Sequence, residues 1–243
     1  MSHYLFNEFN EVSAKEWKQK IQVDLKGADY NDTLVWKNLE GIDVKPFYHL
    51  DETDTNHYSK KVKNPNDWNI AQTIFINNES VSNHFILNAL ERGAECLLLK
   101  ADEEFDIPST FKDFPFQKAT IYFNFSFLSE PFIKNLINFF SDKKSLVYYN
   151  LDPIGNLSRT GNWFHNLKED FEILRKIKNQ KAQEHIVAID GSLYQNSGAN
   201  IIQQLAYSLA HANEYLNYFN DTNLSDFKIT FKLSVGSNYF FEI

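Results

Sequence analysis

The chain has 243 residues, of which 43% are hydrophobic, 16% aromatic and 23% charged. This composition excludes an intrinsically disordered chain, which needs low hydrophobicity and a high net charge. The formal net charge is −8, and no stretch of the chain collects four or more Lys or Arg residues. We therefore expect neither a nucleic acid nor an anionic membrane surface as a partner.

The sequence also argues against export and against a membrane anchor. No apolar run approaches the roughly 18 residues that a transmembrane helix needs. Residues 1–11 contain neither a basic region nor a long apolar segment, so no signal peptide is expected. The single cysteine, Cys96, excludes an internal disulfide and lies among apolar residues, which predicts a buried, unreactive thiol. These features predict a cytoplasmic protein.

Residues 1–67 are predicted to form an N-terminal arm and linker. Ser13 followed three residues later by Glu16 has the spacing of a capping box, which predicts that a helix begins here. Thr33–Trp36 and Ile42–Val44 are predicted to be short strands on either side of a turn. The predicted helix has apolar residues at near-helical spacing and a terminal glycine: Val12, Trp17, Ile21, Leu25 and Gly27.

From residue 68 onwards, short β-rich runs alternate with segments long enough for a helix. The predicted strands are Trp68–Ile76, Glu95–Ala101, Ala119–Phe125, Ser145–Leu151, Ile186–Asp190 and Lys228–Val235. The predicted helices are Ser80–Arg92, Glu130–Phe140, Trp163–Asn179 and Ala199–Phe219. In the last helix an apolar face repeats every 3.6 residues: Ile202, Leu205, Ala206, Leu209, Ala212 and Leu216.

Repeated βα units of this kind predict an α/β fold, either an open doubly wound sheet or a (β/α) barrel. No glycine-rich nucleotide-binding loop follows the first predicted strand, which favours the barrel. An eight-stranded barrel needs two βα units more than the six strands seen here. Residues 68–243 are therefore predicted to form an incomplete (β/α) TIM-type barrel.

Acidic residues follow three of the predicted strands: Asp102, Asp152 and Asp190. In parallel α/β folds functional residues gather at the carboxyl ends of strands, so these three are candidates for acid–base chemistry or for a divalent ion. Aspartate is equally an ordinary turn and helix-capping residue at such places. The seven histidines do not cluster and show no HExxH pattern, so no zinc site is expected.

Several short motifs occur in order along the whole chain. In the arm they include Asp24-Leu25-Lys26-Gly27-Ala28-Asp29-Tyr30, Leu34-Val35-Trp36 and Pro46-Phe47-Tyr48. Farther along they include Trp68-Asn69-Ile70, Arg92-Gly93-Ala94-Glu95, Asp152-Pro153-Ile154-Gly155, Gly161-Asn162-Trp163, Ser197-Gly198-Ala199-Asn200 and Glu214-Tyr215-Leu216. In these motifs the chain closely resembles methylmalonyl-CoA mutases, and specifically the N-terminal part of their small (β) subunits.

The resemblance implies a (β/α)8 barrel preceded by an extended arm that wraps a partner subunit. In the family's catalytic chains the CoA substrate runs along the barrel axis. A separate domain holds adenosylcobalamin, which supplies a radical for the interconversion of methylmalonyl-CoA and succinyl-CoA in propionate metabolism. For this chain the resemblance implies a heterodimer with a catalytic large subunit, with Trp17 and Trp36 of the arm as partner-binding residues.

Three departures from the catalytic chains carry a further implication. Ala71 stands where those chains have an arginine in the first strand, and Leu193 stands where they have a histidine beside the acyl group. Leucine can neither donate a hydrogen bond nor carry charge, so it cannot polarise a thioester carbonyl. The Asp-x-His-x-x-Gly segment that supplies the cobalt ligand does not occur in the 243 residues. The resemblance thus implies a subunit that has no catalytic residues, binds no cofactor itself and supports a catalytic partner.

Two other functions fit the sequence. One is a free-standing barrel enzyme that uses the carboxylates Asp102, Asp152 and Asp190, and the other is a module that binds acyl-CoA. The family resemblance also leads us to expect a fragment or a shortened homologue. The first and sixth strands would then be open edges through which the chain self-associates.

Overall fold

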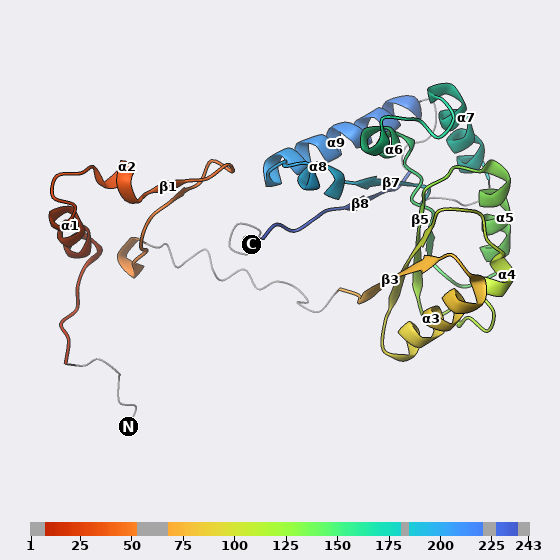
Figure 1. The fold of residues 1–243 in the computed structure, drawn as a ribbon, viewed down its shortest axis with the longest axis horizontal. Helices are drawn as coiled ribbons and strands as arrows, with labels where there is room; N and C mark the ends of the chain where they lie inside the picture. The colour runs from red at the N-terminus through yellow and green to blue at the C-terminus, as the bar shows by residue number, and fades with distance from the viewer. Residues whose placement is uncertain (1–7, 53–67, 181–184, 221–226, 238–243) are drawn as a thin grey trace. The chain divides into compact units, whose positions relative to one another are not determined.

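The computed structural model describes residues 8–52, 68–180, 185–220 and 227–237 (Figure 1). It divides the chain into two compact units, Met1–Asn66 and Asp67–Ile243, and each is described by itself. None of the described helices combines the length and the apolar character that crossing a membrane requires.

The N-terminal unit begins with α1 (Ala14–Asp24), and the predicted capping box is confirmed. The Ser13 hydroxyl accepts a hydrogen bond from the Glu16 N–H at 3.2 Å, and the Glu16 carboxylate accepts one from the Ser13 N–H at 2.9 Å. The strands β1 (Trp36–Lys37) and β2 (Asp43–Val44) pair antiparallel, which confirms the predicted turn between them. A 3-10 turn, η1 (Leu50–Glu52), follows.

One prediction in this unit is wrong. Residues 33 and 34, predicted to begin a strand, belong to the short helix α2 (Tyr30–Leu34). The side chain of Asp29 accepts hydrogen bonds from the N–H groups of Asn31 and Asp32. This capping satisfies backbone donors that a helix start leaves free, and so it overrides the β propensity of the residues that follow.

The second unit confirms the predicted α/β class, with parallel strands and intervening helices. All six predicted strands are present: β3 (Ala71–Ile76), β4 (Cys96–Ala101), β5 (Thr120–Phe125), β6 (Val147–Tyr148), β7 (Val187–Asp190) and β8 (Ile229–Lys232). The first four form one parallel sheet in the order β3-β4-β5-β6, and β7 pairs parallel with β8. A parallel bridge between Leu151 and Val187 joins the segment after β6 to β7. Neighbouring strands therefore follow one another in sequence order.

The core lies between one face of these strands and the helices α3 (Glu79–Glu91), α5 (Glu130–Phe140), α7 (Leu167–Lys178) and α9 (Ile201–Tyr218). Figure 1 shows α5 and α7 next to each other along one side of the strands. Leu97, Leu99, Ile121 and Phe123 alternate along β4 and β5 and are fully buried. The intervening side chains, such as Leu98 and Tyr122, are only half-buried and belong to the opposite face.

Helix α9 does not bury the apolar face that its periodicity predicts. Ala212 is buried, but Ile202, Leu205 and Leu209 are exposed, whereas Gln204 and His211 are among the buried residues. The buried side chains of Gln204 and His211 have partners that compensate for their desolvation. Gln204, for example, accepts a hydrogen bond from the Ser234 N–H at 2.8 Å and donates one to the Ser234 carbonyl at 3.0 Å.

In the described part of the second unit, three short helices were not predicted: α4 (Ile107–Thr110), α6 (Pro153–Thr160) and α8 (Ser192–Asn196). Of these, α6 matters most for the candidate site because it begins directly after Asp152. It has regular start and stop signals, with Asp152 as the N-cap, Pro153 in its first turn and Gly161 as a left-handed C-cap with φ +79°.

Candidate functional site

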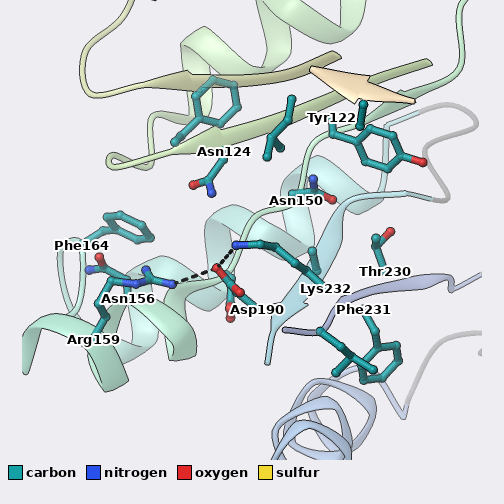
Figure 2. Close-up of a pocket in the computed structure, with 16 residues that line it drawn as sticks. Tyr122, Asn124, Asn150, Asn156, Arg159, Phe164, Asp190, Thr230, Phe231 and Lys232 are labelled. Carbon is teal, nitrogen blue, oxygen red and sulfur yellow. Dashed lines mark hydrogen bonds and ion pairs between the residues drawn. The ribbon is translucent and has the colours of Figure 1, made fainter. Parts of the chain in front are cut away.

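The face of the strands opposite the core carries a cavity of 460 Å³ (Figure 2). Its wall comes from five of the six strands, from α6 and from the segments that follow β6, α6 and β8. Leu98 and Tyr122 are direct partners on β4 and β5, and Asp190 and Lys232 are direct partners on β7 and β8. Because side chains alternate along a strand, these residues project to the same face as one another and away from the buried core.

A charged cluster lies at the carboxyl ends of β7 and β8. The Oδ2 atom of Asp190 is 3.0 Å from Nζ of Lys232 and 3.7 Å from Nη2 of Arg159, at the end of α6. Figure 2 shows both cations reaching the same carboxylate. The other oxygen, Oδ1, accepts hydrogen bonds from the N–H and the hydroxyl of Ser192. Four donors from three parts of the chain thus converge on one carboxylate.

These contacts decide the charge of Asp190. Burial acts to raise the pKa of this carboxyl, but it is outweighed by the hydrogen bonds from Ser192 and Lys232 and by the positive charges of Lys232 and Arg159. The net result is a pKa below the ordinary value of 3.8. Asp190 is therefore an ionised, fully partnered carboxylate at neutral pH, which suits it poorly to act as a general acid.

Asp152 lines the same cavity and is held by a different set of partners. Its Oδ1 atom accepts hydrogen bonds from the Gly155 N–H at 2.9 Å and from the Tyr215 hydroxyl at 2.8 Å. Nε2 of His211 lies 2.9 Å from the same oxygen, and Nδ1 of His211 lies 3.0 Å from the Tyr194 hydroxyl. This buried network connects α6, α8 and α9, so Asp152 has an evident structural role as a cap and an anchor.

Two oxygens of this segment lack hydrogen-bond partners among the described residues. They are Oδ1 of Asn150 and Oδ2 of Asp152, and both atoms are buried. Asn150 lines the cavity and has a left-handed backbone with φ +50°, which is uncommon outside glycine. An unpartnered buried acceptor costs free energy, so these two oxygens are unsatisfied sites next to the cavity.

Tyr122 of β5 adds an aromatic side chain to the cavity wall. The rings of Tyr122 and Tyr148 stack with centroids 4.4 Å apart and planes inclined by 15°. Burial, together with the neighbouring Tyr148, raises the pKa of Tyr122 to about 12. Tyr122 therefore stays a neutral phenol, and this part of the wall is apolar with a hydroxyl at its edge.

The structure brings together two of the three predicted carboxylates. Asp152 and Asp190 both line the cavity, whereas Asp102 lies outside it and accepts a 2.6 Å hydrogen bond from the Ser126 hydroxyl. Within the described ranges no group of three or more His, Cys, Asp or Glu side chains is arranged to hold a metal ion.

Ala71 and Leu193, the two positions at which the resemblance implies a departure from catalytic chains, lie in different places. Ala71 lines the cavity, and Leu193 is half-buried in α8 and is not part of the cavity wall. In the N-terminal unit, Trp17 packs edge-on against Phe47 with ring centroids 5.9 Å apart and keeps half of its surface exposed. Trp36 is 54% exposed.

Sequence reasoning missed Arg159 and the role of Lys232. Arg159 lies in α6, which was not predicted, although Asp152, Pro153 and Gly161 mark the ends of this helix. Lys232 lies in a strand that was predicted, but its pairing with Asp190 depends on the register of β7 and β8. No spacing along the chain discloses that register.

Comparison with known proteins confirms the resemblance inferred from the motifs. The model of the methylmalonyl-CoA mutase family matches residues 146–243. The chain is 25% identical to "Methylmalonyl-CoA mutase small subunit" of Porphyromonas gingivalis, over 98% of this chain and 43% of that protein. It is 23% identical to "Methylmalonyl-CoA mutase" of Cereibacter sphaeroides, over 93% of this chain and 39% of that protein. The protein of the same name from Rhizobium meliloti is 22% identical over 96% of this chain and 40% of its own length. The chain thus spans about two fifths of the length of these relatives.

Proposed function

We propose that this chain is a supporting, non-catalytic part of an adenosylcobalamin-dependent methylmalonyl-CoA mutase. The observation that carries the proposal is the similarity of this chain to a protein named as a small subunit. This similarity extends over 98% of the chain. The holoenzyme would interconvert methylmalonyl-CoA and succinyl-CoA, with the chemistry carried out by a catalytic partner chain.

The residues of the cavity, together with Leu193 outside it, support a role without catalysis. Ala71 presents only a methyl group where catalytic chains carry an arginine, and Leu193 offers no hydrogen bond where they carry a histidine. The remaining charged groups are already engaged with one another, since Asp190 is paired with Lys232 and Arg159. Electrostatic catalysis needs donors that are free to meet the charge that develops in a transition state. These residues do not provide such donors for a thioester.

We also infer that the second unit is part of a (β/α) barrel. The order of strands supports this. In an open doubly wound sheet the strand order reverses at a switch point, whereas neighbouring strands of a barrel follow one another in sequence. From β3 to β8 every neighbour is the next strand along the chain. In this interpretation the cavity lies on the face of the strands that becomes the barrel interior.

The residues do not fit a resident cobalamin. The Asp-x-His-x-x-Gly segment that presents a histidine to cobalt is absent from the sequence. His211 is a buried histidine close to the cavity. Its Nε2 atom contacts Asp152, and its Nδ1 atom contacts the Tyr194 hydroxyl. We therefore propose that adenosylcobalamin belongs to the partner chain, and no step of the reaction is assigned to this one.

The N-terminal unit is the proposed contact with the partner. Trp17 and Trp36 each expose about half of their surface, and Leu39 and Tyr48 of the same unit are more exposed still. Large aromatic side chains of this kind dominate the energetics of interfaces. Self-association through the edge strands β3 and β8 stays a prediction.

A second candidate function is the binding of an acyl-CoA without turnover. The observation that favours it is the 460 Å³ cavity, whose wall includes the apolar side chain of Leu98 and the aromatic side chain of Tyr122. A free-standing enzyme that uses three carboxylates has less support, because Asp102 lies outside the cavity and Asp152 and Asp190 are engaged in structural contacts.

The proposal is tested by complex formation. The purified chain is mixed with the catalytic mutase chain of the same organism and analysed by size-exclusion chromatography with light scattering. A stable complex of one chain of each kind is expected. If the two chains elute separately at micromolar concentrations while both are folded, the supporting role is wrong.

A further inference from the structure

The cation pair beside the cavity has the composition of a carboxylate-binding site. Arg159 and Lys232 come from α6 and β8, and their side chains keep 49% and 48% of their surface exposed. The N–H and the hydroxyl of Ser192 complete a set of four donors (Figure 2 shows the two cations). Guanidinium and ammonium groups joined by backbone and hydroxyl donors are the usual recognition set for a carboxylate.

The group bound by these donors belongs to the chain itself. The carboxylate of Asp190 is 20% exposed, less than half as much as either cation, and each of its oxygens accepts from a different side. Oδ1 faces Ser192, and Oδ2 faces Lys232 and Arg159. The cavity wall thus carries two cations and two carboxylates, Asp152 and Asp190. Both cations lie at ion-pair distance from Asp190 and not from Asp152.

We propose that Asp190 is a built-in counter-anion that occupies a carboxylate-binding site formed by Arg159, Lys232 and Ser192 and closes this site to free carboxylates. The inference depends on these contacts and not on the proposed mutase role. A free carboxylate would have to compete with one that is covalently attached and already in place, which gives the internal group a high effective concentration. Neutral ligands meet no such competition.

The proposal predicts that neutralising Asp190 opens the site. In Asp190→Asn the amide keeps an oxygen for the Ser192 donors but no longer neutralises the two cations. We expect this variant of the full chain to bind succinate at least tenfold more tightly than the parent chain in isothermal titration calorimetry at low salt. Dimethyl succinate, which has similar length and no charge, should bind both proteins equally.

Two control variants separate the site from the charge of the whole protein. Asp102→Asn removes the same negative charge outside the cavity and should leave succinate binding unchanged. Adding Lys232→Met to Asp190→Asn should remove most of the gain. A folded Asp190→Asn protein that binds succinate no better than the parent chain contradicts the proposal, and so does an equal gain in Asp102→Asn.

A measurement on the parent chain covers the case in which Asp190→Asn does not fold. The side-chain carboxyl carbon of Asp190 is followed by NMR as succinate is added. We expect the resonance to stay in place, because the carboxylate keeps its partners. A saturable shift would mean that succinate displaces Asp190, which would overturn the proposal.

Discussion

Nε2 of His211 on α9 lies 2.9 Å from Oδ1 of Asp152, the N-cap of α6. This buried pair ties a long helix to a short one that borders the cavity, and Tyr215 and Tyr194 extend it at 2.8 Å and 3.0 Å. The pair also explains why α9 turns its polar side inwards: the carboxylate, the imidazole and the hydroxyl satisfy one another away from water.

Replacing the histidine should therefore destabilise the fold. His211→Ala removes one of the partners of the Asp152 carboxylate and the imidazole partner of the Tyr194 hydroxyl, which we expect to lower the free energy of unfolding by about 2–4 kcal/mol. Urea denaturation followed by circular dichroism measures the change. His84→Ala, at an exposed position on α3, should change it by less than about 0.5 kcal/mol. Equal effects of the two substitutions would mean that the buried pair adds nothing.

Gly155 gives a test in which two effects have opposite signs. In a helix interior alanine is more favourable than glycine by about 1 kcal/mol. A Cβ atom at position 155, however, would lie 2.0 Å from Oδ2 and 2.6 Å from Cγ of Asp152. The carboxylate would have to leave its capping position, so we expect Gly155→Ala to destabilise the protein by about 1–2 kcal/mol.

The control for this substitution lies in the same helix. Ser158→Ala has no such neighbour and sits at an exposed position, so it should be neutral or slightly stabilising in thermal denaturation. A rise in melting temperature for Gly155→Ala would show that Asp152 does not need its observed position.

The strands were predictable from the sequence because buried parallel strands are short, apolar and separated by helix-length segments. Cys96–Ala101 and Thr120–Phe125 lie within their predicted ranges for this reason. Helix α5 was predicted with both ends correct, since Ser129 caps its start and apolar residues follow at helical spacing. Local patterns of this kind need no knowledge of distant partners.

The candidate site was less predictable because its contacts join residues far apart in the chain. Asp190 was identified as a residue that follows a strand, but its partners Lys232 and Arg159 depend on strand register and on an unpredicted helix. The face that α9 buries could not be deduced either. Periodicity indicates that Ile202 and Leu209 share a face, but only the partners of Gln204 and His211 decide which face points inwards.

The lowered pKa of Asp190 makes a prediction about acid stability. A carboxyl whose pKa is lower in the folded state than in the unfolded state stabilises the fold above the unfolded value, here 3.8. This contribution is complete above about pH 5 and is lost as the pH falls through the folded pKa. Urea denaturation at pH 7, 5, 4 and 3 should therefore show the parent chain and Asp190→Asn converging in stability below pH 4. A difference that stays constant down to pH 3 would contradict the assigned shift.

Trp17 tests the proposed role of the arm. If the arm docks on the catalytic chain, Trp17→Ala should weaken the complex by about 2 kcal/mol or more and leave the melting temperature of the isolated chain nearly unchanged. Val23 is also exposed on α1, and Val23→Ala removes a smaller side-chain surface, so it serves as the control. Affinity is measured by calorimetry with the catalytic chain. A fall in melting temperature without loss of affinity would indicate that Trp17 stabilises its own unit through Phe47.

We propose that this chain supports a mutase and performs no chemistry itself. This proposal is tested most directly by measuring succinyl-CoA formed from methylmalonyl-CoA in the presence of adenosylcobalamin. The assay compares this chain alone, the catalytic chain alone and the two together. We predict no turnover by this chain alone and higher or longer-lasting activity of the mixture than of the catalytic chain by itself. Turnover by this chain alone would contradict the account.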